Sequence, residues 1–135
     1  MTFMKKHWKL KIKPYNSGKL AELICRWYMR FLGYRIIAKN YRCGRGKNTP
    51  YGEIDFIATK GKLIVFCEVK KRNSNNSFWK ALSPRQQQRI LRGGCFFINS
   101  NPQYRKYTIQ YDVFWIKLPF SIKHFKNALF IDKIL

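Results

Sequence analysis

The stretch GEIDFIATKGKLIVFCEVKK, residues 52–71, decides the fold. Two runs of branched and aromatic residues flank a short turn at Lys60-Gly61. This pattern predicts antiparallel strands at about 52–59 and 62–70, joined as a β-hairpin.

Acidic residues gather on this hairpin, which holds Glu53, Asp55 and Glu68, three of the six acids in the chain. Residues two apart on a strand share a face, so Glu53 and Asp55 point one way, and so do Glu68 and Lys70. A two-residue turn places Glu53 opposite Glu68, with Asp55 as its diagonal neighbour. Like charges across a ladder are destabilising, and carboxylates grouped beside a lysine suit a hard divalent cation.

The opposite face of the hairpin is apolar and is expected to pack on a helix. The bland alternative for the acidic face is that each carboxylate simply pairs with a nearby Lys or Arg, such as Glu53 with Arg42. The residues expected on the apolar face are Ile54, Phe56, Ala58, Val65, Cys67 and Val69.

Before the hairpin, Asn16-Ser17-Gly18 predicts a helix start, and the helix runs to about Leu32 before Gly33. Tyr34–Ala38 then predicts a strand, and polar residues follow it. Cys43–Pro50 predicts a mobile basic loop. The apolar stripe expected on the helix is Leu20, Leu23, Ile24, Trp27 and Phe31.

After the hairpin, Ser83-Pro84 predicts the start of a second helix, with Gln86 completing a capping box. Its apolar stripe is Ile90, Leu91, Gly94, Phe97 and Ile98. Tyr107–Ile116 predicts a further strand that carries Asp112, and the tail after Pro119 has no assigned element. The order helix, strands, helix, strand predicts an α/β fold, a mixed sheet flanked by helices.

Composition indicates a folded, strongly basic protein. The chain has 135 residues, 46% of them hydrophobic, with 28 Lys and Arg against 6 Asp and Glu, a net charge of +22. We expect a basic arm at 1–15 and a single domain at 16–135. Such a charge attracts polyanions, which include nucleic acids, ribosomal RNA and anionic membrane surfaces.

The chain is expected to be cytoplasmic and to have no membrane partner. The longest apolar run, Leu63–Cys67, is far shorter than the roughly 20 residues that span a bilayer, and the first residues lack the apolar core of a secretory signal. The four cysteines are widely separated, which predicts buried free thiols rather than a zinc site or disulfides.

Two motifs, Gly52–Ala58 and Val65–Arg72, resemble the "GEIDLIA…VFVEVKTR" hallmark of the YraN-like family. That family resembles the Holliday-junction-resolvase branch of the restriction-endonuclease-like, PD-(D/E)-x-K, superfamily. The resemblance covers about residues 17–116. Further matches are Gly18–Leu23, Gly33-Tyr34, Asn40–Arg42, Ser83–Gln87 and Tyr111–Val113.

The resemblance implies a restriction-endonuclease-like fold and a site for Mg²⁺ or Mn²⁺. Asp55 and Glu68 would be ligands, with help from the Val69 carbonyl, and Lys70 would orient or deprotonate the attacking water. Glu22 matches a helix glutamate that would reach the same metal, although it can instead pair with Arg26 four residues on.

Other residues have predicted roles around this site. Gln87 is expected to face the sheet and touch the site, whereas Gln86 is expected to act only as a cap. Asp112 is expected to be a supporting or structural acid, and Glu53 a supplementary ligand or a partner of Arg42. The basic residues expected to bind nucleic acid are Arg42, Arg45, Lys47, Lys71, Arg72, Arg85 and Arg89, with Arg92 as a further phosphate contact.

Two departures from the family pattern affect these expectations. The Gly44–Pro50 loop is longer than the family's usual link, and its role is open. Gly93 and Gly94 replace the usual alanines, which should weaken the helix by up to about 1 kcal/mol each. Tyr111 stands where the family has Phe, a change expected to matter little.

Three functions therefore stay open. The first is a divalent-metal-dependent endonuclease acting on DNA, with branched or structured DNA among the candidate substrates and DNA favoured over RNA. The second is a nucleic-acid-binding protein that keeps the nuclease fold without cleaving. The third is a basic ribosome-associated factor, which explains the charge but not the grouped acids. A homodimer would suit a symmetric junction, but no interface is legible in the sequence.

Overall fold

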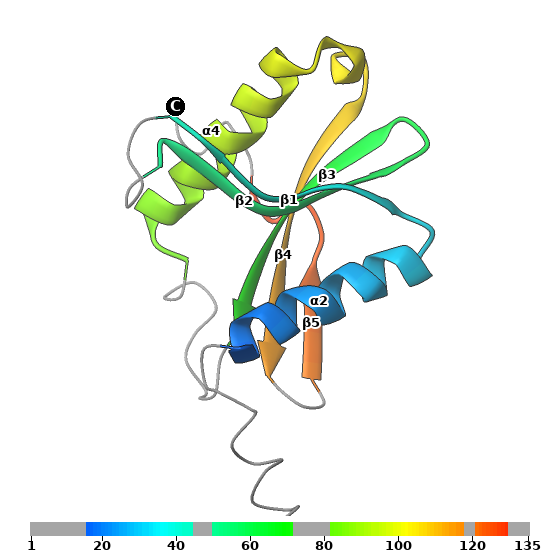
Figure 1. Cartoon of the computed structure of the whole chain (residues 1–135), viewed down its shortest axis with the longest axis vertical. Coiled ribbons are helices and arrows are strands. Elements are labelled where there is room, and N and C mark those ends of the chain that lie inside the picture. The colour runs from blue at the N-terminus through cyan, green and yellow to red at the C-terminus, as the bar shows by residue number, and fades with distance from the viewer. Residues whose placement is uncertain (1–15, 45–49, 72–81, 118–120, 130–135) are drawn as a thin grey trace, which may run out of the picture.

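The computed structural model describes residues 16–44, 50–71, 82–117 and 121–129. A five-stranded sheet lies between two helices, one on each face (Figure 1). The predicted basic arm, the centre of the Gly44–Pro50 loop and residues 72–81 lie outside the described residues. The elements are α2 Asn16–Phe31, β1 Arg35–Cys43, β2 Gly52–Lys60, β3 Leu63–Lys71, α4 Pro84–Ser100, a 3-10 turn Pro102–Tyr104, β4 Thr108–Lys117 and β5 Ser121–Phe125.

The strand order β1-β2-β3-β4-β5 confirms the predicted mixed α/β sheet. Strands β1, β2 and β3 run antiparallel in succession, β3 and β4 are parallel, and β5 returns antiparallel to β4. A parallel pair requires a crossover connection, and α4 lies within it. The helix therefore covers one face of the sheet, and α2 covers the other (Figure 1).

The register of the central hairpin differs from the predicted one. The turn residues are Gly61 and Lys62 rather than Lys60 and Gly61, so Lys60 pairs with Leu63 and the ladder between β2 and β3 ends at Phe56 and Cys67. Gly61 has φ +57°, a left-handed conformation that glycine adopts without steric penalty. The next positions along the two strands are Asp55 and Glu68, so Asp55, not Glu53, is the neighbour of Glu68.

The predicted apolar face of β2 is also wrong at one position. Phe56 and Ala58 pack in the cluster beneath α2, as expected, but Ile54 packs in the cluster beneath α4. The regular alternation of β2 therefore breaks at Asp55, close to where its ladder with β3 ends. A strand that leaves its neighbour at this point opens space between β2 and β3 for side chains.

Helix α2 buries a stripe that differs from the predicted one, although Ile24 of the predicted stripe also packs against the core. Ala21, Cys25 and Met29 are fully buried against the sheet, whereas Trp27 and Phe31 are exposed. Two of the three buried side chains are small, and small side chains let a helix axis approach a sheet closely. Hydrophobicity alone ranked the larger residues first and so selected the wrong face.

The C-terminal end of α2 is held by a residue from the hairpin. Gly33 has φ +95°, as predicted for the residue that ends the helix. The Lys60 Nζ donates a hydrogen bond of 2.8 Å to the Leu32 carbonyl, one of the carbonyls left unpaired at a helix end. A cation at this end also interacts favourably with the helix dipole.

Strand β1 is longer than predicted, and β5 was not predicted. Arg35–Cys43 continues through Asn40, which has φ +51°, and the pairing with β2 is irregular between Ile36 and Ala38. Backbone pairing with β2 keeps the polar residues in the second half of β1 in the strand. Strand β5 contains exposed residues at its edge of the sheet, and its weak hydrophobic pattern gives no strand signal.

Helix α4 begins as predicted, because the Ser83 hydroxyl oxygen accepts a hydrogen bond of 3.2 Å from the Gln86 backbone N–H. Further along, a Cβ atom on Gly52 would lie 2.5 Å from the Gly93 nitrogen. The two glycines therefore allow backbone contact between α4 and β2. This contact, in the middle of α4, holds the helix beside the acidic end of β2.

All four cysteines are free, as predicted, and three of them are buried. Cys95 is exposed, which corrects the expectation for that residue. No helix among the described residues is long and apolar enough to cross a membrane.

Candidate active site

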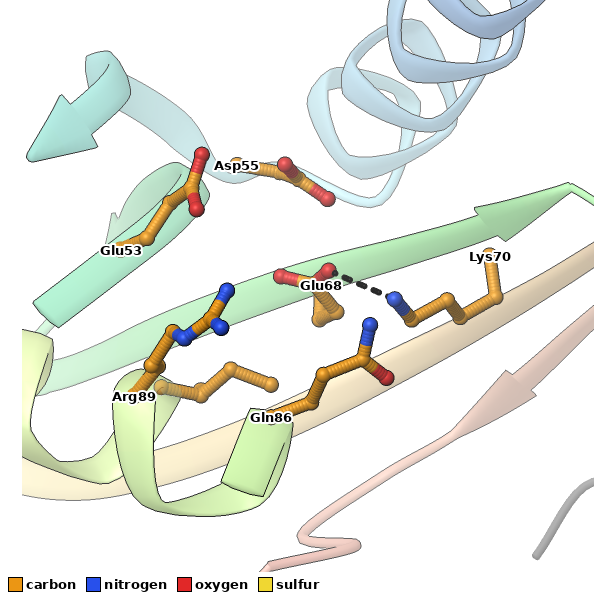
Figure 2. A pocket seen from close by; sticks show the side chains of 7 residues that line it. Glu53, Asp55, Glu68, Lys70, Gln86 and Arg89 are labelled. Atoms are coloured by element: carbon orange, nitrogen blue, oxygen red, sulfur yellow. Dashed lines mark ion pairs between the residues drawn. The ribbon is translucent and has the colours of Figure 1, made fainter. Parts of the chain in front are cut away.

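A pocket of about 130 Å³ opens where β2, β3 and α4 meet (Figure 2). Pockets for organic ligands usually measure roughly 300–1,000 Å³, so this one suits an ion, a few waters and part of a phosphate group. Its lining residues are Glu53 and Asp55 of β2, Glu68 and Lys70 of β3, and Gln86, Arg89 and Ile90 of α4.

Asp55 is fixed in the pocket by a hydrogen bond to the neighbouring strand. The Val69 backbone N–H donates to Asp55 Oδ2 over 2.7 Å. The register of the ladder would otherwise bring Val69 beside Ile54, but the ladder ends before that pair. The Asp55 carboxylate thus accepts a hydrogen bond that a backbone carbonyl of β2 would otherwise accept. This hydrogen bond holds the Asp55 side chain next to Glu68 (Figure 2).

Burial makes ionisation of the Asp55 and Glu68 carboxyl groups less favourable. Burial raises the pKa of Asp55 well above its usual value, and the nearby charge of Glu68 raises it further. Burial also raises the pKa of Glu68 to about 7, although the Lys70 ammonium opposes this shift. The Lys70 Nζ lies 3.4 Å from Glu68 Oε1. The pKa values of both carboxyl groups stay raised despite the neighbouring cation, so a bound metal ion would supply positive charge that the pocket lacks.

The two carboxylates suit Mg²⁺ better than a structural zinc ion. Within the described residues, no group of three or more His, Cys, Asp and Glu side chains is arranged to hold a metal ion. This argues against a self-sufficient protein cage such as a structural zinc site. Mg²⁺ is instead commonly held by one or two carboxylates together with water and substrate phosphates, and Asp55 and Glu68 match that pattern.

Glu53 lines the pocket and pairs with Arg42, one of the two roles predicted for it. Its Oε1 lies 3.1 Å from an Arg42 guanidinium nitrogen, and the Arg42 side chain is 60% exposed. An exposed pair of this kind contributes little to stability. Arg42 therefore remains accessible to a phosphate while it lies beside the site.

On α4, the structure exchanges the expected positions of two glutamines. Gln86 lines the pocket, and the Gln87 side-chain amide donates a hydrogen bond of 3.0 Å to the Leu82 carbonyl instead. The prediction that Gln87 touches the site is wrong, because the angle of the helix turns the preceding position toward β3. Arg89, one turn after Gln86, lines the same pocket, and its helical spacing from Gln86 was the signal that could have revealed both (Figure 2).

Glu22 lies near the site without lining the pocket. It is close enough for its charge to contribute to the raised pKa of Asp55. No ion pair joins it to Arg26 in the part of the chain that the structure describes. Its role as a metal ligand stays a prediction.

The predicted nucleic-acid contacts divide into three groups. Arg85 is exposed, Lys71 is partly buried and Arg89 lies in the pocket. Arg92 donates a hydrogen bond of 2.9 Å to the Tyr51 carbonyl and stacks its guanidinium over the Tyr51 ring, so it supports α4 rather than standing free for phosphate. Arg45, Lys47 and Arg72 lie outside the described residues.

Asp112 is a structural acid away from the pocket. It is 1% exposed and accepts hydrogen bonds of 2.8 Å from Gln110 Nε2 and from the Asn127 backbone N–H. The His124 Nε2 lies 2.6 Å from its second oxygen. This pairing could not be predicted from the sequence, because His124 belongs to strand β5, which has no strand pattern.

The sheet order and flanking helices define an α/β protein that is consistent with a restriction-endonuclease-like core. The profile of the uncharacterised protein family UPF0102 matches residues 21–116, and the chain belongs to this family, which is the YraN-like family whose motifs the sequence carries.

Relatives in several bacteria support this membership. A UPF0102 protein of Bradyrhizobium diazoefficiens is 36% identical over 106 residues, 78% of this chain and 75% of the relative. One from Paramagnetospirillum magneticum is 34% identical over 120 residues, 87% of this chain and 89% of the relative. One from Ehrlichia ruminantium is 34% identical over 115 residues, 84% of each chain.

Proposed function

We propose that this protein is a divalent-metal-dependent endonuclease that hydrolyses phosphodiester bonds in DNA, with branched DNA as the preferred substrate. The observation that carries the proposal is the pair of partly buried carboxyl groups, Asp55 and Glu68, facing one small pocket beside the Lys70 ammonium. Burying like-charged groups together is unfavourable. Carboxyl groups with strongly raised pKa values are typical of catalytic and metal-binding sites.

The pocket residues of β2 and β3 would hold the metal and activate the water. Asp55 and Glu68 would hold Mg²⁺ or Mn²⁺, with the Val69 carbonyl as a further oxygen ligand. When bound, such an ion supplies a Lewis acid that neutralises phosphate charge and allows water to act as a nucleophile near neutral pH. Lys70 orients the water and stabilises the negative charge that develops on the phosphate.

Residues of α4 complete the substrate side of the pocket. Arg89 points into it from the helix, where its guanidinium can hold a phosphate oxygen in a two-pronged contact. Gln86 supplies an amide that can position a water or a phosphate. Arg42 and Arg85 contact the flanking phosphates, which steers the strand without reading its sequence.

The test is cleavage of linear, flapped and four-way DNA by the purified protein, with Mg²⁺, Mn²⁺ or EDTA. Asp55→Asn keeps an acceptor for the Val69 N–H and removes the charge, and Lys70→Met keeps the length of the side chain. We expect cleavage only with metal, and a loss of about 100-fold or more in either variant while DNA binding survives. The coarser variants Asp55→Ala and Lys70→Ala should behave alike.

The matched control is Lys106→Met, which removes the same charge from an exposed turn outside the pocket. It should cleave like the unaltered protein. Metal-dependent cleavage that survives both site variants would refute the assignment of the site. Binding without any cleavage by the unaltered protein would favour the alternative, a nucleic-acid-binding protein that retains a nuclease fold.

A further inference from the structure

The exposed face of α2 carries an apolar stripe that the core does not use. Leu20, Trp27 and Phe31 are 48%, 62% and 89% exposed. Their spacing of seven and four residues places them on one side of the helix, away from the buried row that packs on the sheet. Large aromatic side chains so exposed and so aligned point to a binding surface.

A row of cations runs beside this stripe. Lys19, Arg26 and Arg30 are again seven and four residues apart, so they form a second line along the same helix. Lys19 and Arg30 are exposed, and Arg26 is partly so. The only acid of α2 is Glu22, whose charge acts on Asp55. The outward surface of α2 is thus apolar and cationic.

The charges decide what this surface binds. A second copy of the chain would bring another net charge of +22 against it, and residues 1–15 carry five lysines and no acid. Both are repelled. The fitting partner has flat apolar faces along a regularly charged anionic backbone, which is the chemistry of unpaired nucleotides. Duplex bases are stacked on one another and do not offer their faces in this way.

We propose that α2 binds single-stranded nucleic acid, with bases stacked on Trp27 and Phe31 and phosphates held by Lys19, Arg26 and Arg30. The two rings are one helical turn apart, a rise of about 6 Å. Stacking on aromatic rings together with a cationic track is how proteins hold single strands without regard to sequence. The inference deepens the proposed function, on which it rests, since branched DNA exposes unpaired nucleotides next to a duplex.

The position of α2 suits this role. The helix packs on the sheet face opposite α4, and Glu22 near its start lies within electrostatic reach of Asp55. In Figure 2 the blue helix at the upper right lies on the other side of the carboxylates from Arg89 and Gln86 of α4. A nucleic-acid strand bound along α2 would therefore lie close to the site where the scissile phosphate would sit.

The experiment is equilibrium binding of fluorescent oligothymidine and of a matched duplex, both in EDTA so that cleavage plays no part. Trp27→Ala and Phe31→Ala should each weaken binding of the single strand by about 5- to 100-fold and change duplex binding by less than about 2-fold. Arg30→Gln should lower the slope of log affinity against log salt by about 0.7.

Phe96→Ala is the matched control, because Phe96 is 45% exposed on α4, on the opposite side of the sheet. It should bind both ligands normally. Unchanged single-strand affinity in Trp27→Ala and Phe31→Ala would overturn the proposal. So would sedimentation showing a dimer that these variants dissociate, or retained oligonucleotide binding with lost binding to phosphatidylglycerol vesicles.

The two proposals fail separately. If the unaltered protein cleaves no DNA but its single-strand binding depends on Trp27 and Phe31, the nuclease proposal is refuted and the binding role of α2 stands. If cleavage depends on Asp55 but single-strand binding does not change in Trp27→Ala, only the proposed binding role of α2 is refuted.

Discussion

Glu68 sits in surroundings that oppose its own charge, and this has a consequence for stability. Its pKa is raised from 4.5 to about 7, chiefly by burial. Between these values the folded protein keeps a proton that the unfolded chain has released. The free energy of unfolding therefore falls as pH rises from about 4.5 to 7, and the loss is complete above that range.

Glu68→Gln should remove this penalty. We expect the metal-free variant to be more stable than the unaltered protein at pH 8, by roughly 1–3 kcal/mol, and close to it at pH 5. Urea unfolding in EDTA at pH 5, 6, 7 and 8 measures the difference. Glu53→Gln serves as the control, since that side chain is paired near the surface. A Glu68→Gln protein that is no more stable at pH 8 would contradict the electrostatic account.

Two departures from the family pattern compensate for one another in the core. Tyr111 was expected to matter little, yet its hydroxyl donates a hydrogen bond of 3.3 Å to the Leu91 carbonyl in α4. A Cβ atom on Gly94 would clash with the Tyr111 hydroxyl oxygen. The tyrosine hydroxyl therefore occupies the space that an alanine at 94 needs, and the glycine is a packing requirement rather than a simple weakness of the helix.

Gly94→Ala should destabilise the protein by about 1–3 kcal/mol, despite the better helix propensity of alanine, because the buried ring cannot move away. In a Tyr111→Phe background the same change should cost about 1 kcal/mol less, because the clash with the hydroxyl is gone while the edge of the ring still crowds the Cβ atom. Denaturant unfolding of the two single variants and the double variant gives the coupling. Additive effects would show that the hydroxyl and the Cβ do not compete for space.

At the scale of elements, the sequence predicted the order of helices and strands better than their faces. The start of α4 was correct because Ser83, Pro84 and Gln86 act through local hydrogen bonds and backbone angles. The buried face of α2 was wrong because it depends on how closely the helix approaches the sheet, and small side chains settle that distance. No local pattern in the sequence carries this information.

The candidate site was predicted in part for the same reason. Asp55, Glu68 and Lys70 share a pocket as expected, because a two-residue period places them on one side of a hairpin. The register was wrong by one position on each strand, since a turn at Lys60-Gly61 and a turn at Gly61-Lys62 both suit the sequence. The contribution of Gln86 depends on the tilt of α4, which only the tertiary packing decides.

Strand β5 is attached to the sheet by a buried polar pair. His124 stacks on Phe114, with ring centroids 4.3 Å apart, and its Nε2 meets the Asp112 carboxylate. Removing one member of a buried pair leaves the other without its partner. His124→Ala should therefore lower the free energy of unfolding by about 2–4 kcal/mol.

Hydrogen exchange should locate that effect. In His124→Ala the amides of β5 and the facing end of β4 should exchange faster, while those of the β2–β3 hairpin stay protected against local opening. His124→Gln, which keeps a donor for the carboxylate, should recover part of the loss, and Lys123→Ala on the exposed side of the same strand should have little effect. A His124→Ala protein of full stability would mean that the pair does not hold the strand.

Most acidic residues of the described part of the chain gather at the pocket, and basic residues surround it. Of the acids in the described residues, Glu53, Asp55 and Glu68 line the pocket, Glu22 acts on it and Asp112 is buried beneath the other helix. With 28 basic residues in the chain, the surroundings of the pocket attract polyanions while the pocket itself attracts cations. A nucleic-acid phosphate and a divalent ion can therefore be drawn to the same place by opposite charges.

Metal binding should consequently stabilise the whole fold in a pH-dependent way. The carboxyl groups must lose their protons to act as ligands, and the pKa of Glu68 is about 7. Mn²⁺ or Mg²⁺ should therefore raise the midpoint of thermal unfolding at pH 8 and have little effect at pH 5.5. At a metal concentration 100 times the dissociation constant the gain is about 2.7 kcal/mol, which corresponds to several degrees for a chain of this size.

Differential scanning fluorimetry at the two pH values, with Ca²⁺ and EDTA alongside, measures this gain. Asp55→Asn and Glu68→Gln should each abolish most of it, whereas Lys106→Met should retain it, because that residue lies outside the pocket. An equal shift at both pH values, or one that survives loss of both carboxylates, would place the ion elsewhere on the protein. The readout needs no nucleic acid, so it tests the electrostatics of the pocket independently of any cleavage.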